Sequence, residues 1–177
     1  TATGGGTDYT LANGTLTIAA GQTSGAISIA VVDDALDEAA ETVIVTLSSP
    51  SNATLGSDTA HTYTINDDDA TPTVDFNVTS SNGAESVAAV VLTVDLSAIS
   101  SKDVTVDYAL TGTATGGGTD YTLANGTLTI AAGQASGTIS IVVVDDALYE
   151  AAETVIVTLS SPTNATLGSD TAHTYTI

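Results

Sequence analysis

Cysteine, methionine and tryptophan are absent from this sequence of 177 residues, and Phe76 is its only phenylalanine. Without cysteine, the chain can form neither a disulfide nor a thiolate metal site. Basic residues are almost missing too, since Lys102 alone stands against 21 acidic residues and the formal net charge is −20. Nucleic acids and anionic membrane surfaces attract cationic proteins, so this charge balance argues against both as partners.

Two further features are missing. No apolar run approaches the roughly 18 residues that a membrane-spanning helix needs, so we expect no membrane insertion. No nucleophile elbow, phosphate-binding loop or EF-hand spacing occurs, and we expect the chain not to be an enzyme. The two histidines, His61 and His173, occupy equivalent positions of a repeat. We expect both to lie on the outer surface of the last strand, facing away from Tyr63 and Tyr175.

An internal repeat is the strongest positive feature. Residues 1–65 recur as residues 113–177 with 60 identical positions of 65, an offset of 112 residues. The five differences are Thr23/Ala135, Ala26/Thr138, Ala30/Val142, Asp37/Tyr149 and Ser51/Thr163. A period of this length has the size of a domain rather than of a solenoid unit. We therefore expect residues 1–69 to be the C-terminal part of a first repeat with its acidic linker. Residues 70–177 are expected to be a second, nearly complete repeat.

Within one period, apolar residues alternate with polar ones in short segments rich in Val, Ile, Leu and Thr. A period of two residues between apolar side chains is typical of strands that have one buried face. Seven such segments are predicted, namely 73–78, 87–96, 103–110, 127–131, 137–144, 154–160 and 172–177. Turn sequences such as Asn82-Gly83 and Asn125-Gly126 separate them. The predicted class is all-β, with tandem immunoglobulin-like Greek-key sandwiches of about seven strands per 112-residue repeat.

Acidic residues gather near strand ends, for example at Asp33-Asp34 and at Asp145-Asp146. Two carboxylates held about 4 Å apart repel one another by about 4 kcal/mol at an effective dielectric constant near 20. A divalent cation between them removes that cost. Calcium binds six to eight oxygens and accepts irregular geometry, so it suits such loops. The alternative is that these residues only solvate turns and keep the chain soluble.

The order of these elements resembles the Calx-beta domains, which are calcium-binding sandwiches. Matching elements are Val104–Tyr108, Gly112–Ala114, Thr119–Tyr121, Leu128–Ile130 with Gly133, Ile141–Asp146, Glu150 with Glu153, Val157–Leu159, Ala165–Gly168, Tyr175–Ile177 and Ile65–Asp69. The resemblance covers the whole period and is specific in order and spacing.

The resemblance implies a set of carboxylates that hold Ca²⁺ near one end of each repeat. In the first copy they are Asp8, Asp33, Asp34 and Glu38, closed by Asp67, Asp68 and Asp69. In the second copy they are Glu85, Asp120, Asp145, Asp146 and Glu150. Glu41 and Glu153 are expected to be surface or turn residues rather than ligands. Asp37 is not expected to be an essential ligand, because Tyr149 replaces it in the second copy.

The function expected from this reading is structural. The chain would be a calcium-binding repeat of a long extracellular or cell-surface array, an adhesin stalk or fibre in which Ca²⁺ at domain junctions stiffens the rod. Its partners would be identical repeats in the same or adjacent chains, with a cell-surface or matrix ligand bound by regions outside these residues. The alternatives are a self-assembling filament subunit, a ligand-binding adhesion module and a calcium sensor attached to a transporter.

Overall fold

Fourteen strands and no helix make up the computed structural model, which describes all 177 residues. No segment is therefore a helix that could cross a membrane. The contacts divide the chain into two units. The first contains Thr1–Ala35 and Ala39–Asp68, and the second contains Leu36–Glu38 and Asp69–Ile177.

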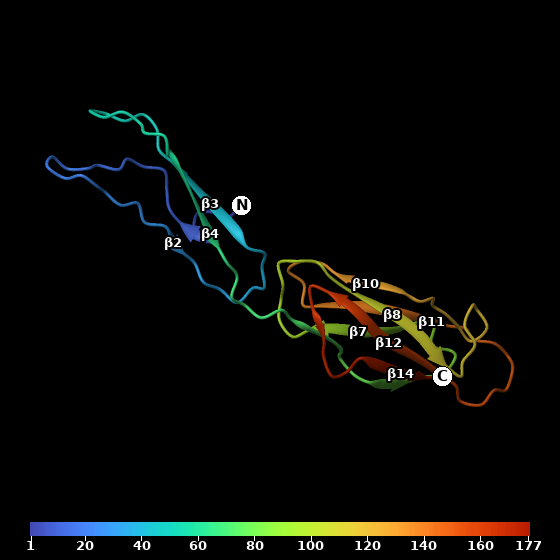
Figure 1. Cartoon of the computed structure of the whole chain (residues 1–177). Helices are drawn as coiled ribbons and strands as arrows, with labels where there is room; N and C mark the ends of the chain where they lie inside the picture. Colours follow the sequence, from blue (N-terminus) through green and yellow to red (C-terminus); the bar gives the residue numbers. More distant parts are fainter. The chain divides into compact units, whose positions relative to one another are not determined.

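The second unit is a sandwich of two five-stranded sheets (Figure 1). Its strands are β5 (Thr73–Phe76), β6 (Ser80–Asn82), β7 (Val90–Leu96), β8 (Val104–Gly112), β9 (Tyr121–Thr122), β10 (Gly126–Ile130), β11 (Ser136–Val143), β12 (Thr154–Thr163), β13 (Thr166–Leu167) and β14 (Ala172–Thr176). One sheet has the order β10-β8-β12-β14-β6 and the other the order β13-β5-β7-β11-β9. Most neighbours are antiparallel, whereas β13 with β5 and β14 with β6 are parallel.

The seven predicted strand segments are all present, and the predicted all-β sandwich is confirmed. Three further strands, β6, β9 and β13, were not predicted, because each has only two or three residues and therefore shows no alternation. The core lies between the sheets and is almost entirely aliphatic. Its most buried members are Val74, Val94, Val104, Val106, Ile130, Ile141, Val155, Val157 and Tyr175.

The first unit contains only four strands. They are β1 (Tyr9–Thr10), β2 (Ala30–Val31), β3 (Glu41–Thr46) and β4 (Ala60–Ile65), arranged as two pairs. In the second unit β12 pairs with both β14 and β8, whereas β3 pairs with β4 alone. Identical side chains consequently differ in burial, since Leu47 is 44% exposed and its equivalent Leu159 is 2% exposed.

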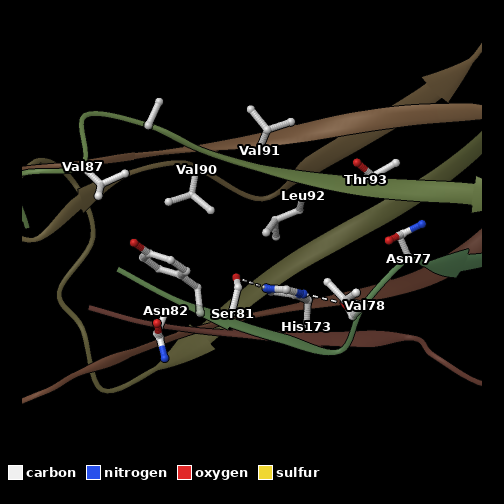
Figure 2. Close-up of a pocket in the computed structure, with 12 residues that line it drawn as sticks. Asn77, Val78, Ser81, Asn82, Val87, Val90, Val91, Leu92, Thr93 and His173 are labelled. Atoms are coloured by element: carbon white, nitrogen blue, oxygen red, sulfur yellow. Dashed lines mark hydrogen bonds between the residues drawn. The ribbon is translucent and has the colours of Figure 1, made fainter. Parts of the chain in front are cut away.

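The expectation that the histidines are surface residues is wrong for His173, which is 1% exposed. Positions 173 and 175 are two residues apart in a strand, so their side chains share a face with each other rather than taking opposite faces. Figure 2 shows His173 hydrogen-bonded between Ser81 and Val78. Its Nε2 lies 2.8 Å from Ser81 Oγ, and its Nδ1 lies 2.7 Å from the Val78 carbonyl oxygen. His61 is exposed in the first unit.

The same region holds a cavity of about 400 Å³ between β6 and β7 (Figure 2). Residues of β7, including Val90 and Leu92, form one wall, and Ser81, His173 and Tyr175 form the other. The chain switches from one sheet to the other between β5 and β6, and this switch leaves the gap. Because its lining mixes aliphatic side chains with hydrogen-bonded polar groups, the cavity does not resemble an acidic metal site.

Candidate metal centre

The acidic site of the second unit is built on Asp120, which sits in the loop before β9 and is 9% exposed. Two backbone hydrogen bonds fix the loop, because Asp120 N donates to the Thr115 carbonyl and Val144 N donates to the Asp120 carbonyl. Its carboxylate accepts a hydrogen bond from Thr115 N at 2.5 Å. The remaining acceptor capacity of this carboxylate is available to a second group.

Glu153 lies beside Asp120 at the start of β12. Its backbone pairs with Ile177, with N···O distances of 3.2 and 2.9 Å in the two directions. This pairing holds the side chain at the end of the sandwich. The Oε2 atom of Glu153 is buried and no donor group reaches it. The only hydrogen bond available between Glu153 and Asp120 therefore requires a proton on one of the two acids.

Two more carboxylates complete a small pocket with this pair. Glu85 and Glu150 line it together with Asp120 and Glu153, and Val144, Ala151 and Ile177 supply its apolar wall. Its volume is about 10 Å³, close to the smallest that admits one water molecule. No three acidic or histidine side chains converge closely enough to enclose an ion by themselves.

Hydrogen bonding, burial and like charge all raise the pKa values of glutamates in the pocket. Hydrogen bonding to Asp120, burial, and the charges of Asp120 and Glu150 raise the pKa of Glu153. Burial and the charges of Asp120, Asp146 and Glu85 raise the pKa of Glu150. A carboxyl group whose pKa is raised in the folded state binds a proton, or another cation, more tightly there than in the unfolded chain.

The same pair recurs in the first unit, where Asp8 and Glu41 take the places of Asp120 and Glu153. Thr3 N donates to Asp8 at 2.5 Å, and Glu41 Oε2 is again buried without a donor. Burial and the neighbouring Asp8 raise the pKa of Glu41. The arrangement therefore depends on the local loop and strand start, which both units share.

Some of the predicted calcium ligands line the pocket, whereas others are exposed outside it. Asp120, Glu85 and Glu150 meet in the pocket. Asp145 and Asp146 are exposed after β11, and Asp146 caps a turn by accepting from Leu148 N at 2.6 Å. Asp33 and Asp34 are exposed after β2. The boundary between the units falls inside the acidic linker, since Asp67 and Asp68 belong to the first unit and Asp69 belongs to the second. Glu38 also belongs to the second unit. That these acidic residues bind calcium stays a prediction.

Glu153 and Glu41 were expected to be surface or turn residues rather than ligands. The structure leaves both partly exposed and places each beside an aspartate, Asp120 or Asp8. One signal was available in the sequence. Each glutamate directly precedes the apolar segment of a central strand, and the first side chain of such a strand lies at the rim of the core.

These features define a class of protein, a two-sheet β-sandwich repeat with an acidic pocket at one end. The chain belongs to the Calx-beta domain family, whose model matches residues 1–69 and 67–176. Among curated relatives, sodium/calcium exchanger 1 of Rattus norvegicus is 30% identical over 176 residues, and that of Canis lupus familiaris is 29% identical. These matches cover 89% of this chain and only 18% of each exchanger.

Solved structures agree on the fold. The apo-form Calx CBD1 domain superposes with a TM-score of 0.56 at 24% identity, covering 61% of this chain and 96% of that domain. CBD12 from CALX1.2 superposes with a TM-score of 0.54 at 22% identity, covering 84% of this chain and 71% of that one. At this level of identity the likeness establishes the sandwich and carries no information about ligands.

The raised pKa values predict an unusual dependence of stability on pH. In chelator, we expect the melting temperature to rise as the pH falls from 7 toward 4.5, the ordinary glutamate value. A raised folded-state pKa gives stability that is fully present below the unfolded value and lost as pH rises through the folded value. Asp37, whose pKa is lowered from 3.8, keeps its contribution throughout this window. Differential scanning calorimetry at several pH values measures the effect.

The matched control for this measurement is the double variant Glu41→Gln, Glu153→Gln. Acidification also reduces the overall negative charge, and that general effect remains in the variant. A gain on acidification that is equally large in the variant and in the parent chain would contradict the assignment of the effect to these two pairs.

Proposed function

We propose that the chain is a calcium-binding structural repeat of a long extracellular array, such as an adhesin stalk or surface fibre. The observation that carries this proposal is the partly buried acid pair, Asp120 with Glu153, which recurs as Asp8 with Glu41. Each pair contains a buried oxygen that has no donor. A divalent cation satisfies such an oxygen and cancels the repulsion at the same time.

The residues fit calcium better than other common metals. All the candidate side-chain ligands are carboxylates, which suit Ca²⁺ and Mg²⁺ rather than the soft metals that prefer thiolate or imidazole. Asp120 and Glu153 would contact the ion directly, and Glu150 and Glu85, which line the same pocket, would approach it once it is bound. Backbone carbonyls and water would supply the remaining oxygens. Calcium tolerates this irregular set, whereas Mg²⁺ requires near-ideal octahedral geometry. When bound, the ion supplies positive charge and cross-links the loops that carry these residues.

Repetition supports a mechanical role. Sixty of 65 positions are identical between the copies, which is expected when each repeat performs the same task. Extracellular calcium modules commonly bind in the range of about 10⁻⁴–10⁻³ M, so a surface array would be saturated outside a cell. With one cation among 21 acids, the chain has few ion pairs of its own. Calcium at the repeat ends would then stiffen the array by neutralising charge, without making or breaking a covalent bond.

Small-angle X-ray scattering of the full chain tests the mechanical part of the proposal. We expect calcium to narrow the distribution of maximum dimensions relative to chelator, because neutralised loops no longer repel one another. The variant Glu41→Gln, Glu153→Gln should lose most of this response, and Asp58→Asn, which removes one exposed charge elsewhere, should keep it. An identical scattering profile in calcium and in chelator would count against the stiffened array.

A further inference from the structure

A stretch of β7 in the second unit has a neighbouring strand on one side only. β11 pairs with β7 from Val90 to Asp95, whereas β5 pairs with it only from Val94 to Leu96. Beyond Phe76 the chain leaves this sheet and continues as β6 in the other one. No strand therefore takes the place of β5 beside residues 90–92, and these residues line the 400 Å³ cavity.

The backbone of Val91 faces this gap. In an antiparallel ladder, successive residues direct their N–H and C=O groups to opposite neighbours. Asn77 N donates to the Thr93 carbonyl oxygen on the β5 side, and Leu96 N donates to the Ala135 carbonyl oxygen on the β11 side. Odd-numbered residues of β7 thus face β5, so the N–H and C=O of Val91 point to the side where no strand pairs with them.

Side chains alternate along the same stretch. Figure 2 shows Val90 and Leu92 on the cavity side of β7 and Val91 on the other side, where it is 61% exposed. His173 and Tyr175 line the opposite wall and are each 1% exposed. The Tyr175 hydroxyl is buried without a hydrogen-bond partner, and burial raises its pKa, so it remains a donor. No acidic or basic side chain lines the cavity.

We propose that this gap binds an extended, uncharged peptide segment of a partner protein, which pairs with Val91 as an added strand. One residue of the segment exchanges two backbone hydrogen bonds with Val91. Its two neighbours in the segment place apolar side chains between the sheets. Addition of a strand to an unpaired edge is a general mode of peptide recognition. Residues 90–93 line the cavity, so the paired segment has about four residues and a length of about 13 Å.

The chemistry of the cavity selects this occupant. A donor and an acceptor on one residue complement the amide groups of a strand, and a peptide also brings acceptor oxygens for the Tyr175 hydroxyl. A charged side chain would be buried there without a partner, which is costly. The net charge of −20 also repels an acidic segment. The proposal goes beyond the calcium-binding role, because the cavity and the acidic pocket share no residue.

Nuclear magnetic resonance of the full chain tests the pairing, with the blocked peptide acetyl-Val-Thr-Val-Thr-Val-amide as the probe. Bound peptide should slow solvent exchange of the Val91 amide by at least about tenfold, because this N–H gains an acceptor. The Leu92 amide, which faces β11, should change little. No effect on Val91 at about 1 mM peptide would overturn the proposal. Protection of Val91 in the chain alone, lost on dilution, would show instead that a second copy fills the gap.

A methylated peptide separates strand pairing from simple uptake of apolar side chains. Methyl groups on the nitrogens of two adjacent central residues block both edges of the peptide and keep its side chains. This peptide should bind at least about tenfold more weakly than the parent peptide. Equal binding of the two peptides would refute strand pairing. The comparison uses the unaltered chain, so it does not depend on the folding of a variant.

The two neighbouring valines provide matched variants of the chain. Val90→Phe places a larger side chain in the cavity and should weaken peptide binding at least about tenfold. Val91→Phe changes a side chain that points away from the cavity and keeps the backbone groups, so its affinity should stay within about twofold of the parent value. Melting curves confirm that each variant is folded. A folded Val90→Phe chain that binds the peptide as well as the parent chain would place the site elsewhere and contradict the proposal.

Discussion

Saturating calcium is expected to raise the melting temperature of the chain by about 10 °C. A ligand at 100 times its dissociation constant stabilises the folded state by about 2.7 kcal/mol. For a unit of about 100 residues, 1 kcal/mol corresponds to about 4 °C or more. The physical source is the acid pair, since the hydrogen bond to Asp120, burial and neighbouring negative charge raise the pKa of Glu153, and a calcium ion there would offset the unfavourable charge. Scanning calorimetry in calcium and in chelator measures the shift.

Substitutions at the acid pairs distinguish calcium binding at these pairs from a general screening of the chain's negative charge by calcium. Glu153→Gln supplies an amide donor to Asp120 and removes one charge, so the chain should be more stable in chelator and respond less to calcium. With Glu41→Gln added, the response should fall below about a third of the parent value. Asp58→Asn should leave the response unchanged, and magnesium at equal concentration controls for ionic strength. A full calcium response in the double variant would show that the ion binds elsewhere.

Gly112→Ala is expected to destabilise the second unit by about 3 kcal/mol, the upper end of the usual cost of overfilling a packed core. Gly112 ends β8 with a φ of +125°. A Cβ atom there would lie 2.1 Å from the Thr154 carbonyl oxygen and 3.2 Å from Val155 Cα. These are backbone atoms of the central strand β12, so neither can move aside without disturbing the sheet. The melting temperature should fall by about 12 °C or more.

This substitution should also weaken calcium binding, because Thr154 directly follows Glu153. The Thr154 carbonyl oxygen accepts from the N–H groups of both Thr113 and Ala114, so displacing it disturbs the strand start that positions the acid pair. Gly133→Ala is the matched control, since Gly133 has a φ of +78° and nothing within 4 Å of an added Cβ. Its cost should be only about 1–2 kcal/mol from the left-handed backbone. Equal losses for the two variants would contradict the steric argument.

The sequence by itself determined the repeat and the strands. Alternation of apolar and polar residues depends only on the local geometry of a strand, so segments such as 90–96 and 137–143 were recognised without knowledge of their partners. The same alternation, applied with the correct parity, places His173 on the face of Tyr175. The family resemblance rested on the order of these segments, and the family model confirmed it.

Which acidic residues are buried, and which groups they face, depends on how distant segments pack together. Asp145 and Glu153 are both carboxylates near strand ends, yet Asp145 is exposed and Glu153 lies against Asp120. Asp37 is buried, and the donors that satisfy its carboxylate come from Ser100 and Lys102, more than 60 residues along the chain. Leu47 and Leu159 have identical local sequences and opposite exposure, since β8 pairs with β12 and no strand takes that place beside β3. The physical reason is common to all three cases. Local sequence sets the face to which a side chain points, whereas burial and charge depend on the segments that pack against that face.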